Sequence, residues 1–356
     1  MSTPKHVGIL TGGGDCPGLN AVIRAVTLAL HNECGARVTG IERGFFGLVE
    51  RKARPLGPQD VAGILAEGGT ILGTHNTCNP FKYPDGSDRS AEAITFAKDL
   101  GLDALVAIGG DGTMTIAHRF EEMGLPVVGV PKTIDNDLAL TDRTFGFDSA
   151  VAVVAEALDR LATTARSHGR VMIAETMGRY AGWIALEGGM AGGANVILLP
   201  EVPFSIETVA RLCQDRESRG LATLICIAEG AHAVGQGMTI RETLAHSPDP
   251  LRLGGVGHWL QHELQPRLQA EVRTTLLGHT QRGGHPTAFD RVLATRFGYH
   301  AAQLVKAGQY GRMVALQGDH CVSVSLDQVA GRTRNVPLDH EMLLAARGIG
   351  VSLGDR

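Results

Sequence analysis

The chain has 356 residues, of which 44% are hydrophobic, 20% are charged and 47 are glycines. A single hydrophobic core seldom exceeds roughly 250 to 300 residues, so this length predicts two lobes and excludes a small binding module. Lysine and arginine number 33 against 37 acidic residues, a net charge of −4. This balance argues against a nucleic-acid partner, and the apolar runs are far shorter than the ~20 residues of a membrane helix.

The six cysteines form no C-x-x-C pair and show no metal-type spacing. We expect no signal peptide before them. We therefore expect free thiols in a cytoplasmic protein.

Seven short apolar runs are predicted to be β-strands, with helix-like stretches between them. They are rich in Val, Ile and Leu, which is typical of strands buried on both faces of a parallel sheet. We predict an α/β fold with largely parallel sheets and ligands at the carboxyl ends of the strands. The runs are His6–Leu10, Arg37–Ile41, Ala104–Ile108, Pro126–Val130, Arg170–Ala174, Asn195–Leu199 and Thr223–Ala228.

Two of these strands end in glycine-rich turns. Residues 11–15 read Thr-Gly-Gly-Gly-Asp, residues 109–113 read Gly-Gly-Asp-Gly-Thr, and helix-like stretches follow at 20–30 and 114–122. A glycine-rich turn before a helix offers bare backbone N–H groups and the positive end of the helix dipole to a phosphate. One such turn alone is as readily a tight connection, but two in one sheet favour phosphate binding.

The segment Pro131–Asp137 places a lysine and two carboxylates at another strand end. Alternate residues of an extended loop point the same way, so we expect Asp135 and Asp137 to face one pocket. One carboxylate can take a proton from an attacking hydroxyl while the other helps to hold a cation, as phosphoryl transfer requires. Taken alone, the segment is better explained by a solvated acidic turn.

Arginines and a glutamate stand beside glycines further along the chain. Arg179 follows Met-Gly past a strand, Glu229 ends the strand at 223–228, and Arg273 and Arg282 flank or occupy the glycine-containing segment 278–284. Arginine forks bind phosphate bidentately, and glycine neighbours let the backbone approach it. Any one of these arginines alone is more often a surface ion-pair partner.

The motifs together resemble the phosphofructokinase family, in order and spacing, over nearly the whole chain. The Gly-Gly-Asp-Gly-Thr loop alone also resembles NAD kinases and diacylglycerol-type lipid kinases, but those lack the other motifs. The motifs are Gly-Gly-Gly-Asp-Cys-Pro-Gly-Leu-Asn at 12–20, Gly-Gly-Asp-Gly-Thr at 109–113, Pro-Lys-Thr-Ile-Asp-Asn-Asp at 131–137, Met-Gly-Arg at 177–179 and His-Thr-Gln-Arg-Gly-Gly at 279–284.

The resemblance implies a glycolytic kinase that, with Mg²⁺, phosphorylates the 1-hydroxyl of fructose 6-phosphate in a cleft between two Rossmann-like lobes. It makes Asp135 the general base, with Thr133 near the transferred phosphate and Asp137 near the metal-bound cluster. Asp111 matches the Mg²⁺ contact, and Lys132 completes the catalytic set. The donor lobe is predicted at residues 1–145 and 281–331, and the sugar lobe at 146–280 and 332–356.

The resemblance also implies which residues contact each substrate. The donor positions are Gly14, Phe45, Gly110, Asp111, Gly112 and Thr113. The sugar-phosphate positions are Thr133, Ile134, Asp135, Arg170, Met177, Gly178, Arg179, Glu229, Arg273, His279, Thr280, Gln281 and Arg282. Within this set, His279 and Arg282 match contacts to the 6-phosphate. Arg170 and Arg273 match arginines that reach it from a neighbouring subunit, which implies a homodimer or homotetramer.

Two positions bear on the phosphoryl donor, because the family divides between ATP and pyrophosphate. Gly112 matches the ATP users; pyrophosphate users commonly carry an aspartate there, which would crowd and repel a nucleotide α-phosphate. Lys132 matches the pyrophosphate users, although Lys132 together with Gly112 also occurs in ATP-using members of that branch. We expect ATP, with the reversible pyrophosphate-dependent enzyme as the alternative.

Three further positions concern the donor. Asn76 stands where many bacterial ATP enzymes have an arginine that bridges the donor and acceptor phosphates, and Lys132 is the candidate to replace that charge. Ile116 stands where many ATP users have glycine, and its side chain would narrow the nucleotide groove. Phe45 stands where an aromatic ring packs by the adenine in relatives, with a core phenylalanine as the equal alternative.

Of the arginine cluster that binds effectors in bacterial relatives, Arg24 is matched but the next position is Leu28. We therefore expect weak or absent activation by nucleoside diphosphates. A non-catalytic regulatory subunit that binds sugar phosphate is a remaining alternative. It is disfavoured because Asp111, Asp135 and Asp137 are all present.

Overall fold

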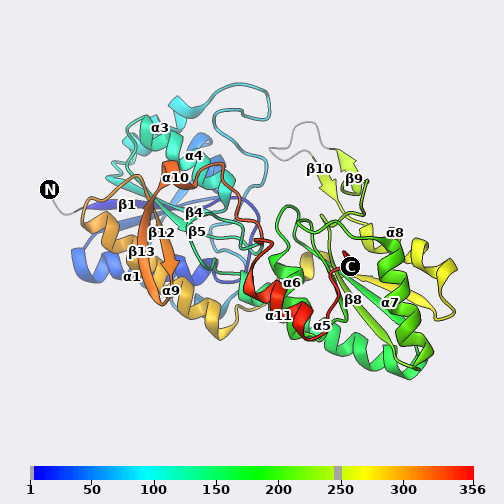
Figure 1. Ribbon diagram of the computed structural model, residues 1–356. Coiled ribbons are helices and arrows are strands. Elements are labelled where there is room, and N and C mark those ends of the chain that lie inside the picture. The colour runs from blue at the N-terminus through cyan, green and yellow to red at the C-terminus, as the bar shows by residue number, and fades with distance from the viewer. Residues whose placement is uncertain (1–3, 244–250) are drawn as a thin grey trace.

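The computed structural model describes residues 4–243 and 251–356, and most of their strands belong to two sheets (Figure 1). The larger sheet has seven strands in the order β13-β12-β5-β4-β1-β2-β3. These strands are β1 (His6–Thr11), β2 (Arg37–Ile41), β3 (Ala53–Leu56), β4 (Ala104–Gly109), β5 (Val127–Pro131), β12 (Arg312–Gln317) and β13 (His320–Ser325).

The interior of the larger sheet is parallel, and its two edge strands are antiparallel. β1 pairs in parallel with β2 and β4, β4 with β5, and β5 with β12. β3 and β13 run antiparallel to their neighbours. β1 and β4 are buried along their whole length, which explains their continuous apolar sequences.

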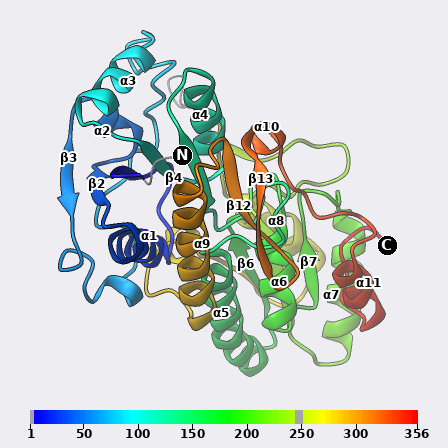
Figure 2. The same cartoon turned by 90° about the vertical axis from the view of Figure 1, so that its left-hand side faces the viewer.

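Helices cover both faces of this sheet (Figure 2). Along β4, Val106 and Ile108 share an apolar cluster with α1 and α9, whereas Leu105 and Ala107 pack in the cluster of α2, α3, α4 and α10. The 3-10 turn η1 (Ile64–Ala66) lies beside α1. The helices are α1 (Leu19–Cys34), α2 (Phe45–Val49), α3 (Ser90–Asp99), α4 (Asp111–Glu122), α9 (Ala288–Lys306) and α10 (Leu326–Val329).

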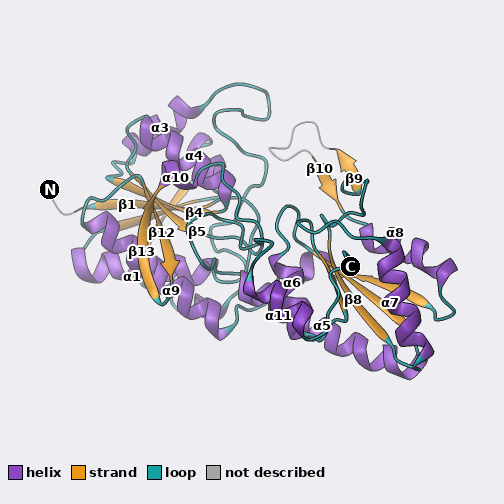
Figure 3. Ribbon diagram, in the orientation of Figure 1, coloured by secondary structure: helices purple, strands orange, loops and turns teal. Residues whose placement is uncertain are grey.

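The smaller sheet is wholly parallel, in the order β11-β6-β8-β7 (Figure 3). α5 and α6 cover one of its faces, and α7 and α8 cover the other. Its elements are α5 (Phe147–His168), β6 (Val171–Thr176), α6 (Trp183–Ala191), β7 (Val196–Leu198), α7 (Ile206–Ser218), β8 (Thr223–Ala228), α8 (Val256–Leu264) and β11 (Val272–Leu276).

The remaining elements lie outside the two sheets. β9 (Ile240–Thr243) and β10 (Leu251–Leu253) form an antiparallel pair. Two 3-10 turns, η2 (Gln265–Arg267) and η3 (Gly278–Gln281), flank β11, and α11 (Glu341–Gly348) lies near the C-terminus beside α6. Within the described ranges, no helix is both long enough and apolar enough to cross a membrane.

A buried polar junction joins the first turns of α5 and α9. Asp290 of α9 is fully buried, and its Oδ2 accepts hydrogen bonds from the Ser149 backbone N–H at 2.8 Å and hydroxyl at 2.6 Å. Thr287, the N-cap of α9, donates its hydroxyl to Asp148 at 2.6 Å and its N–H to the Ser149 hydroxyl at 3.0 Å. Each helix start therefore satisfies free polar groups of the other.

All seven predicted strands are present, with bounds that differ by two residues or fewer, and the α/β class with largely parallel sheets is confirmed. The strands that were not predicted are β3, β9, β10, β11, β12 and β13. The boundaries of the two lobes stay a prediction.

Candidate active site

The two glycine-rich turns lie side by side, at the carboxyl ends of the neighbouring strands β1 and β4. The Gly12 N–H donates to the Ile108 carbonyl at 2.8 Å, which ties the first turn to β4. The Thr113 side chain fills the space between the turns so closely that a Cβ on Gly12 or Gly109 would collide with it. Glycine is therefore required at both positions for steric reasons.

The first turn of α4 carries the groups predicted to hold the donor and the metal ion. Gly110 is the N-cap, and Asp111 opens the helix with its Oδ1 accepting from the Gly331 N–H at 2.8 Å. Burial raises the pKa of the Asp111 carboxyl. Gly112 adjoins open space, since no described atom lies within 4 Å of a Cβ built there.

Two cations reach the first glycine-rich turn from different parts of the chain. The Lys132 ammonium donates to the Gly14 carbonyl, and the lysine is only 4% exposed. Burial lowers the pKa of this ammonium group. The Arg282 guanidinium donates to the Asp15 carbonyl at 3.2 Å. The motif at 279–284 and the motif at 131–137 therefore meet at the first turn.

Asp135 and Asp137 do not lie on a regular extended loop. Asn136 between them has a left-handed backbone, with φ of 52°, and its buried side chain accepts from the Thr144 N–H at 3.0 Å. Asparagine adopts this conformation more readily than most residues. Burial and the charge of Asp135 together raise the pKa of Asp137 to about 7, so the two carboxylates still interact. A turn, and not simple alternation, brings them together.

Asp135 lies where charges from the loops of both sheets meet. Burial raises the pKa of its carboxyl; the Arg282 guanidinium opposes this rise, Glu229 adds to it and Arg179 opposes it. The Asp135 N–H donates to the Thr133 hydroxyl at 3.1 Å. Its Oδ1 is buried and accepts no hydrogen bond from any residue that the structure describes. Such an oxygen is suited to receive a hydroxyl proton.

The ends of β6 and β8 and the turn η3 enclose a cavity of about 140 Å³. The Glu229 N–H donates to the Thr176 carbonyl at 2.9 Å, and the Met177 N–H donates to the buried Gln281 side chain at 3.3 Å. Burial raises the pKa of Glu229. The cavity is lined by Glu175, Thr176, Met177, Glu229, Leu253, Gly254, Leu276, Gly278 and His279.

Gly178, Thr280 and Arg179 complete the loops beside this cavity. Gly178 has φ of 123°, a conformation that side chains other than hydrogen rarely allow. The Thr280 hydroxyl of η3 donates to the carbonyl of Leu277, the N-cap of this turn, at 2.6 Å. Arg179 acts electrostatically on both Asp135 and Glu229. The loops predicted to hold the sugar and the predicted base therefore share one electrostatic environment.

Arg170 and Arg273 lie at the opposite end of the smaller sheet. Both pair with Glu271: Arg170 Nε lies 2.5 Å from its Oε2, and Arg273 contacts its Oε1. Arg273 is in register with Met172 on β6. Met172 precedes Met177, which lines the cavity, by five residues, so the backbone of Arg273 lies about 16 Å from the cavity along the strand direction. Neither arginine is among the residues that line the cavity.

The side chains of Phe45 and Ile134 are part of the apolar core. Phe45 is 4% exposed, and its ring centroid lies 5.7 Å from that of Phe120. Ile134 is fully buried. This packing agrees with the core alternative for Phe45, and any contact of Ile134 with a ligand would come from its backbone.

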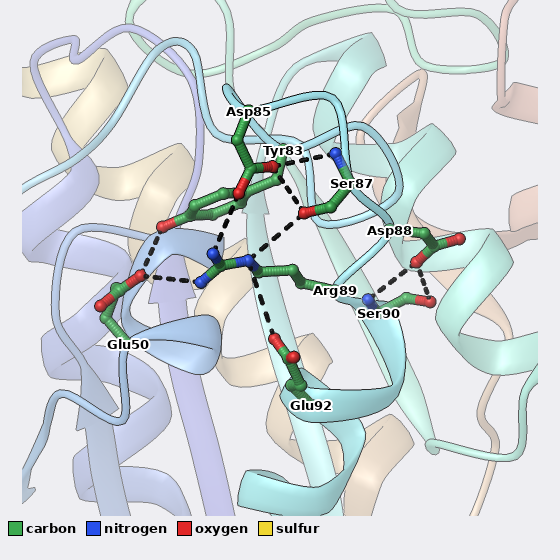
Figure 4. A network of polar contacts seen from close by, with 8 residues as sticks. All are labelled: Glu50, Tyr83, Asp85, Ser87, Asp88, Arg89, Ser90 and Glu92. Carbon is green, nitrogen blue, oxygen red and sulfur yellow. Dashed lines mark hydrogen bonds and ion pairs between the residues drawn. The ribbon is translucent and has the colours of Figure 1, made fainter.

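A polar network around Arg89 fixes the chain that leads into α3 (Figure 4). Tyr83 donates its hydroxyl to Glu50 at 2.7 Å, so the loop is also tied to the end of α2. These side chains are partly exposed, so each pair alone is weak. Arg89 pairs with Asp85 at 3.0 Å, Glu50 at 3.6 Å and Glu92 at 3.9 Å.

Sequence reasoning missed Glu175 and Asn136. Glu175 is the one charged residue of β6, which is buried along its whole length, and that exception was a usable signal, because a glutamate is almost never fully buried without partners. Asn136 was quoted within its motif, but nothing in the residue types there distinguished a turn from an extended loop.

A buried carboxylate together with two glycine-rich turns of the kind that bind phosphates is an arrangement suited to phosphoryl transfer to a hydroxyl, and here it defines a phosphotransferase of the α/β class. The phosphofructokinase family model matches residues 6–305. The chain therefore belongs to the phosphofructokinase family, as its motifs indicated.

Curated relatives of both donor types cover nearly the whole chain. Pyrophosphate–fructose 6-phosphate 1-phosphotransferase of Amycolatopsis methanolica is 51% identical over 93% of this chain and 96% of its own. ATP-dependent 6-phosphofructokinase 2 of Clostridium perfringens is 46% identical over 100% of both chains. Among solved structures, phosphofructokinase of Pichia pastoris in the T-state matches with a TM-score of 0.80 at 33% identity, covering 92% of this chain and 38% of that one.

Proposed function

We propose that the protein is an ATP-dependent 6-phosphofructokinase that converts fructose 6-phosphate to fructose 1,6-bisphosphate. The observation that carries this proposal is the position of Asp135. Its buried Oδ1 has no hydrogen-bond donor among the described residues. Its carboxylate interacts electrostatically with Arg282, Glu229 and Arg179. The relatives of both donor types support the acceptor, because both names specify phosphorylation of fructose 6-phosphate.

In this proposal Asp135 accepts the proton of the 1-hydroxyl as that oxygen attacks the transferred phosphorus. The raised pKa of its buried carboxyl makes it a stronger base than an exposed aspartate. The Thr133 hydroxyl lies beside Asp135 and accepts its N–H, and Asp137 follows Asp135 by two residues. Lys132, which contacts the Gly14 carbonyl, offsets the negative charge of the transferred phosphoryl group.

Mg²⁺ fits the oxygen ligands of the donor side. One oxygen of Asp111 accepts the Gly331 N–H, and the same carboxylate opens α4 beside Gly112. No group of three or more His, Cys, Asp or Glu side chains in the described ranges forms a metal cage. Mg²⁺ commonly binds through one or two carboxylates and the substrate phosphates. When bound, it would neutralise charge on the donor phosphates.

On the acceptor side we assign the sugar ring to Met177, Gly178 and Arg179, a sugar hydroxyl to Glu229, and the 6-phosphate to His279 and Arg282. Thr280, Gln281 and the Ile134 backbone complete this side. The support is that the Met177 loop, Glu229 and His279 line one cavity.

We further propose that Arg170 and Arg273 complete the site of a neighbouring subunit in a homodimer or homotetramer. Two observations support this assignment. Both arginines lie far from the cavity of their own chain, and both pair with Glu271 at the surface. The donor lobe would comprise residues 1–145 and 281–331, and the sugar lobe residues 146–280 and 332–356.

The donor can be tested directly, by comparing initial rates with ATP and with pyrophosphate at a fixed concentration of fructose 6-phosphate. We expect the faster turnover with ATP, because the open space at Gly112 admits a nucleotide phosphate. The second candidate, the reversible pyrophosphate-dependent enzyme, is favoured by buried Lys132 on the Gly14 turn and by the 51% identical relative. A faster rate with pyrophosphate would establish that candidate instead.

Gly112→Asp refines the test. Space is free for the new side chain, and an aspartate in the first turn of a helix is compatible with the helix dipole, so the fold should be retained. The variant should lose most ATP-dependent activity, roughly 100-fold in kcat/KM, through repulsion of the nucleotide. An unchanged rate with ATP would remove Gly112 from donor selection.

A further inference from the structure

Glu175 is a buried carboxylate at the end of β6, and no step of the proposed reaction uses it. It is 4% exposed, and both of its oxygens are occupied. Oε1 accepts from the Gly255 N–H at 2.9 Å, and Oε2 accepts from the Gly257 N–H at 2.8 Å. These amides belong to the start of α8, a nine-residue helix with Gly255 as its N-cap. The carboxylate therefore supplies acceptors that the helix start lacks.

The backbone before α8 is shaped around this carboxylate. Gly254 has φ of 133° and Gly255 has φ of 87°, so both need a glycine backbone. A Cβ on Gly257 would lie 3.0 Å from Glu175 Oε2 and 2.9 Å from the Thr274 methyl group. The Thr274 hydroxyl holds the same turn from β11 by donating to the Gly257 carbonyl at 3.1 Å. The sequence Gly-Gly-Val-Gly at 254–257 is thus explained by a close approach to Glu175.

The segment held in this way forms part of the sugar cavity. Leu253 and Gly254 line the cavity that Glu229 and His279 also line, and Glu175 itself contributes to the lining. Leu253 is buried, so its side chain has little freedom to move unless the turn itself moves. The position of this wall therefore depends on the two hydrogen bonds to Glu175.

We propose that Glu175 is a positioning residue for the acceptor sugar, fixing the Leu253–Gly255 segment as a wall of the cavity beside Glu229. This inference rests on the proposed function, since it assigns the cavity to fructose 6-phosphate. The donor turns and Asp135 lie on other elements and do not contact this wall through any of the hydrogen bonds described. Loosening the wall should therefore weaken acceptor binding and leave the chemical step and donor binding nearly intact.

Glu175→Gln tests the role with little change of shape. The glutamine oxygen can accept from one of the two amides, but its NH₂ group faces the other N–H and leaves that amide without an acceptor. We expect KM for fructose 6-phosphate to rise about tenfold, with kcat within about twofold of wild type and KM for ATP unchanged. Glu175→Asp retains two carboxylate oxygens on a shorter side chain and should give a smaller rise in the same KM.

Two further variants keep the test decisive. Asp103→Asn is the control, because Asp103 also accepts from two backbone amides, those of Lys5 and His6, at the amino-terminal end of β1. It should leave both KM values unchanged. Thr274→Val loosens the same turn from β11 and should raise KM for fructose 6-phosphate two- to threefold, even if Glu175→Gln fails to fold.

The wild type is assayed first, so that the two ideas fail separately. A wild type that does not phosphorylate fructose 6-phosphate would contradict the proposed function itself. An active wild type, with a folded Glu175→Gln variant whose KM for fructose 6-phosphate is unchanged, would overturn the positioning role. A loss confined to kcat, an equal rise of KM for ATP, or an unchanged Thr274→Val variant would overturn it as well.

Discussion

At the scale of single residues, Asp135 has a carboxylate oxygen that no described residue satisfies, although buried polar atoms normally have partners. A bound sugar hydroxyl would supply the missing hydrogen bond. The raised pKa of the Asp135 carboxyl suits a general base, and the nearby arginines Arg282 and Arg179 suit the binding of anionic substrate groups. Both features are therefore explained by a site that holds a base close to a phosphate.

Asp135→Ser should reduce kcat by roughly 10² to 10⁴ and leave KM for fructose 6-phosphate nearly unchanged, because the base acts in the transition state and most contacts to the sugar come from other residues. Steady-state kinetics of the purified variant measure this. Asp159→Ser, at an exposed carboxylate of α5, is the control and should behave as wild type. Near-normal turnover of Asp135→Ser would rule out the role.

The residue types near Asp135 could be predicted from the sequence, but their conformations could not. Carboxylates at a strand end indicate chemistry, whereas the left-handed backbone of Asn136 depends on its hydrogen bond to Thr144, eight residues further along the chain. Glu175 escaped notice for a similar reason. Its partners lie about 80 residues away, and only the fold brings the Gly255 and Gly257 amides to it.

At the scale of elements, the paired starts of α5 and α9 depend on one side chain. Asp290→Ala removes the acceptor of both Ser149 donors from a fully buried site, so we expect a loss of about 2 to 4 kcal/mol in the free energy of unfolding. Urea denaturation monitored by circular dichroism measures it. Asp159→Ala, on the exposed side of α5, should cost much less. Equal losses in the two variants would contradict the role of the junction.

The charge of Asp290 also predicts a dependence of stability on pH. Burial raises the pKa of Asp290 to about 6 from an ordinary value of 3.8, so the folded state binds this proton more tightly than the unfolded chain does. The contribution of Asp290 to stability is therefore complete below about pH 4 and declines as pH rises to about 6.

Asp290→Asn keeps an acceptor oxygen and removes the titration. Its stability relative to wild type should increase between pH 4 and pH 7, which thermal melts across that range would show. A constant difference between the two proteins would mean that the carboxyl titrates normally in the folded state.

The predictability of most strands followed their burial. The seven strands that were found have largely apolar sequences, and β12 is the exception, because its buried Met-Val-Ala-Leu run at 313–316 was not predicted. The edge strands β3 and β13 are largely exposed or half-buried, and β11 is partly exposed with a threonine-rich sequence, so their residues lack such a pattern. The late return of β12 to pair with β5 could not be predicted from local sequence at all.

At the scale of the whole molecule, the length indicated two lobes, and the positions of Arg170 and Arg273 extend the site beyond one chain. We expect Asp135→Ser subunits and Arg170→Ala/Arg273→Ala subunits each to be nearly inactive alone. Co-expressed in equal amounts as random dimers, they should regain about a quarter of wild-type activity, because half of the sites in each hybrid have all their native residues.

The standard assay of the unfractionated mixture measures this recovery, and hybrids purified through two different affinity tags should show about half of wild-type activity. Hybrids of wild type with each variant calibrate the activity per intact site. If activity remains at the sum of the two separate variants, the arginines do not act across a subunit boundary.

The order of the strands in the larger sheet has a further consequence during synthesis of the chain. β5 ends at Pro131, but its neighbour β12 begins only at Arg312, after the entire smaller sheet. At 5 to 20 residues per second, the roughly 180 intervening residues take about 10 to 40 s to emerge from the ribosome. Throughout that time β5 is an open, apolar sheet edge, the kind of surface to which other chains add. The nascent protein should therefore be most prone to aggregation, and most in need of chaperone protection, just before β12 appears.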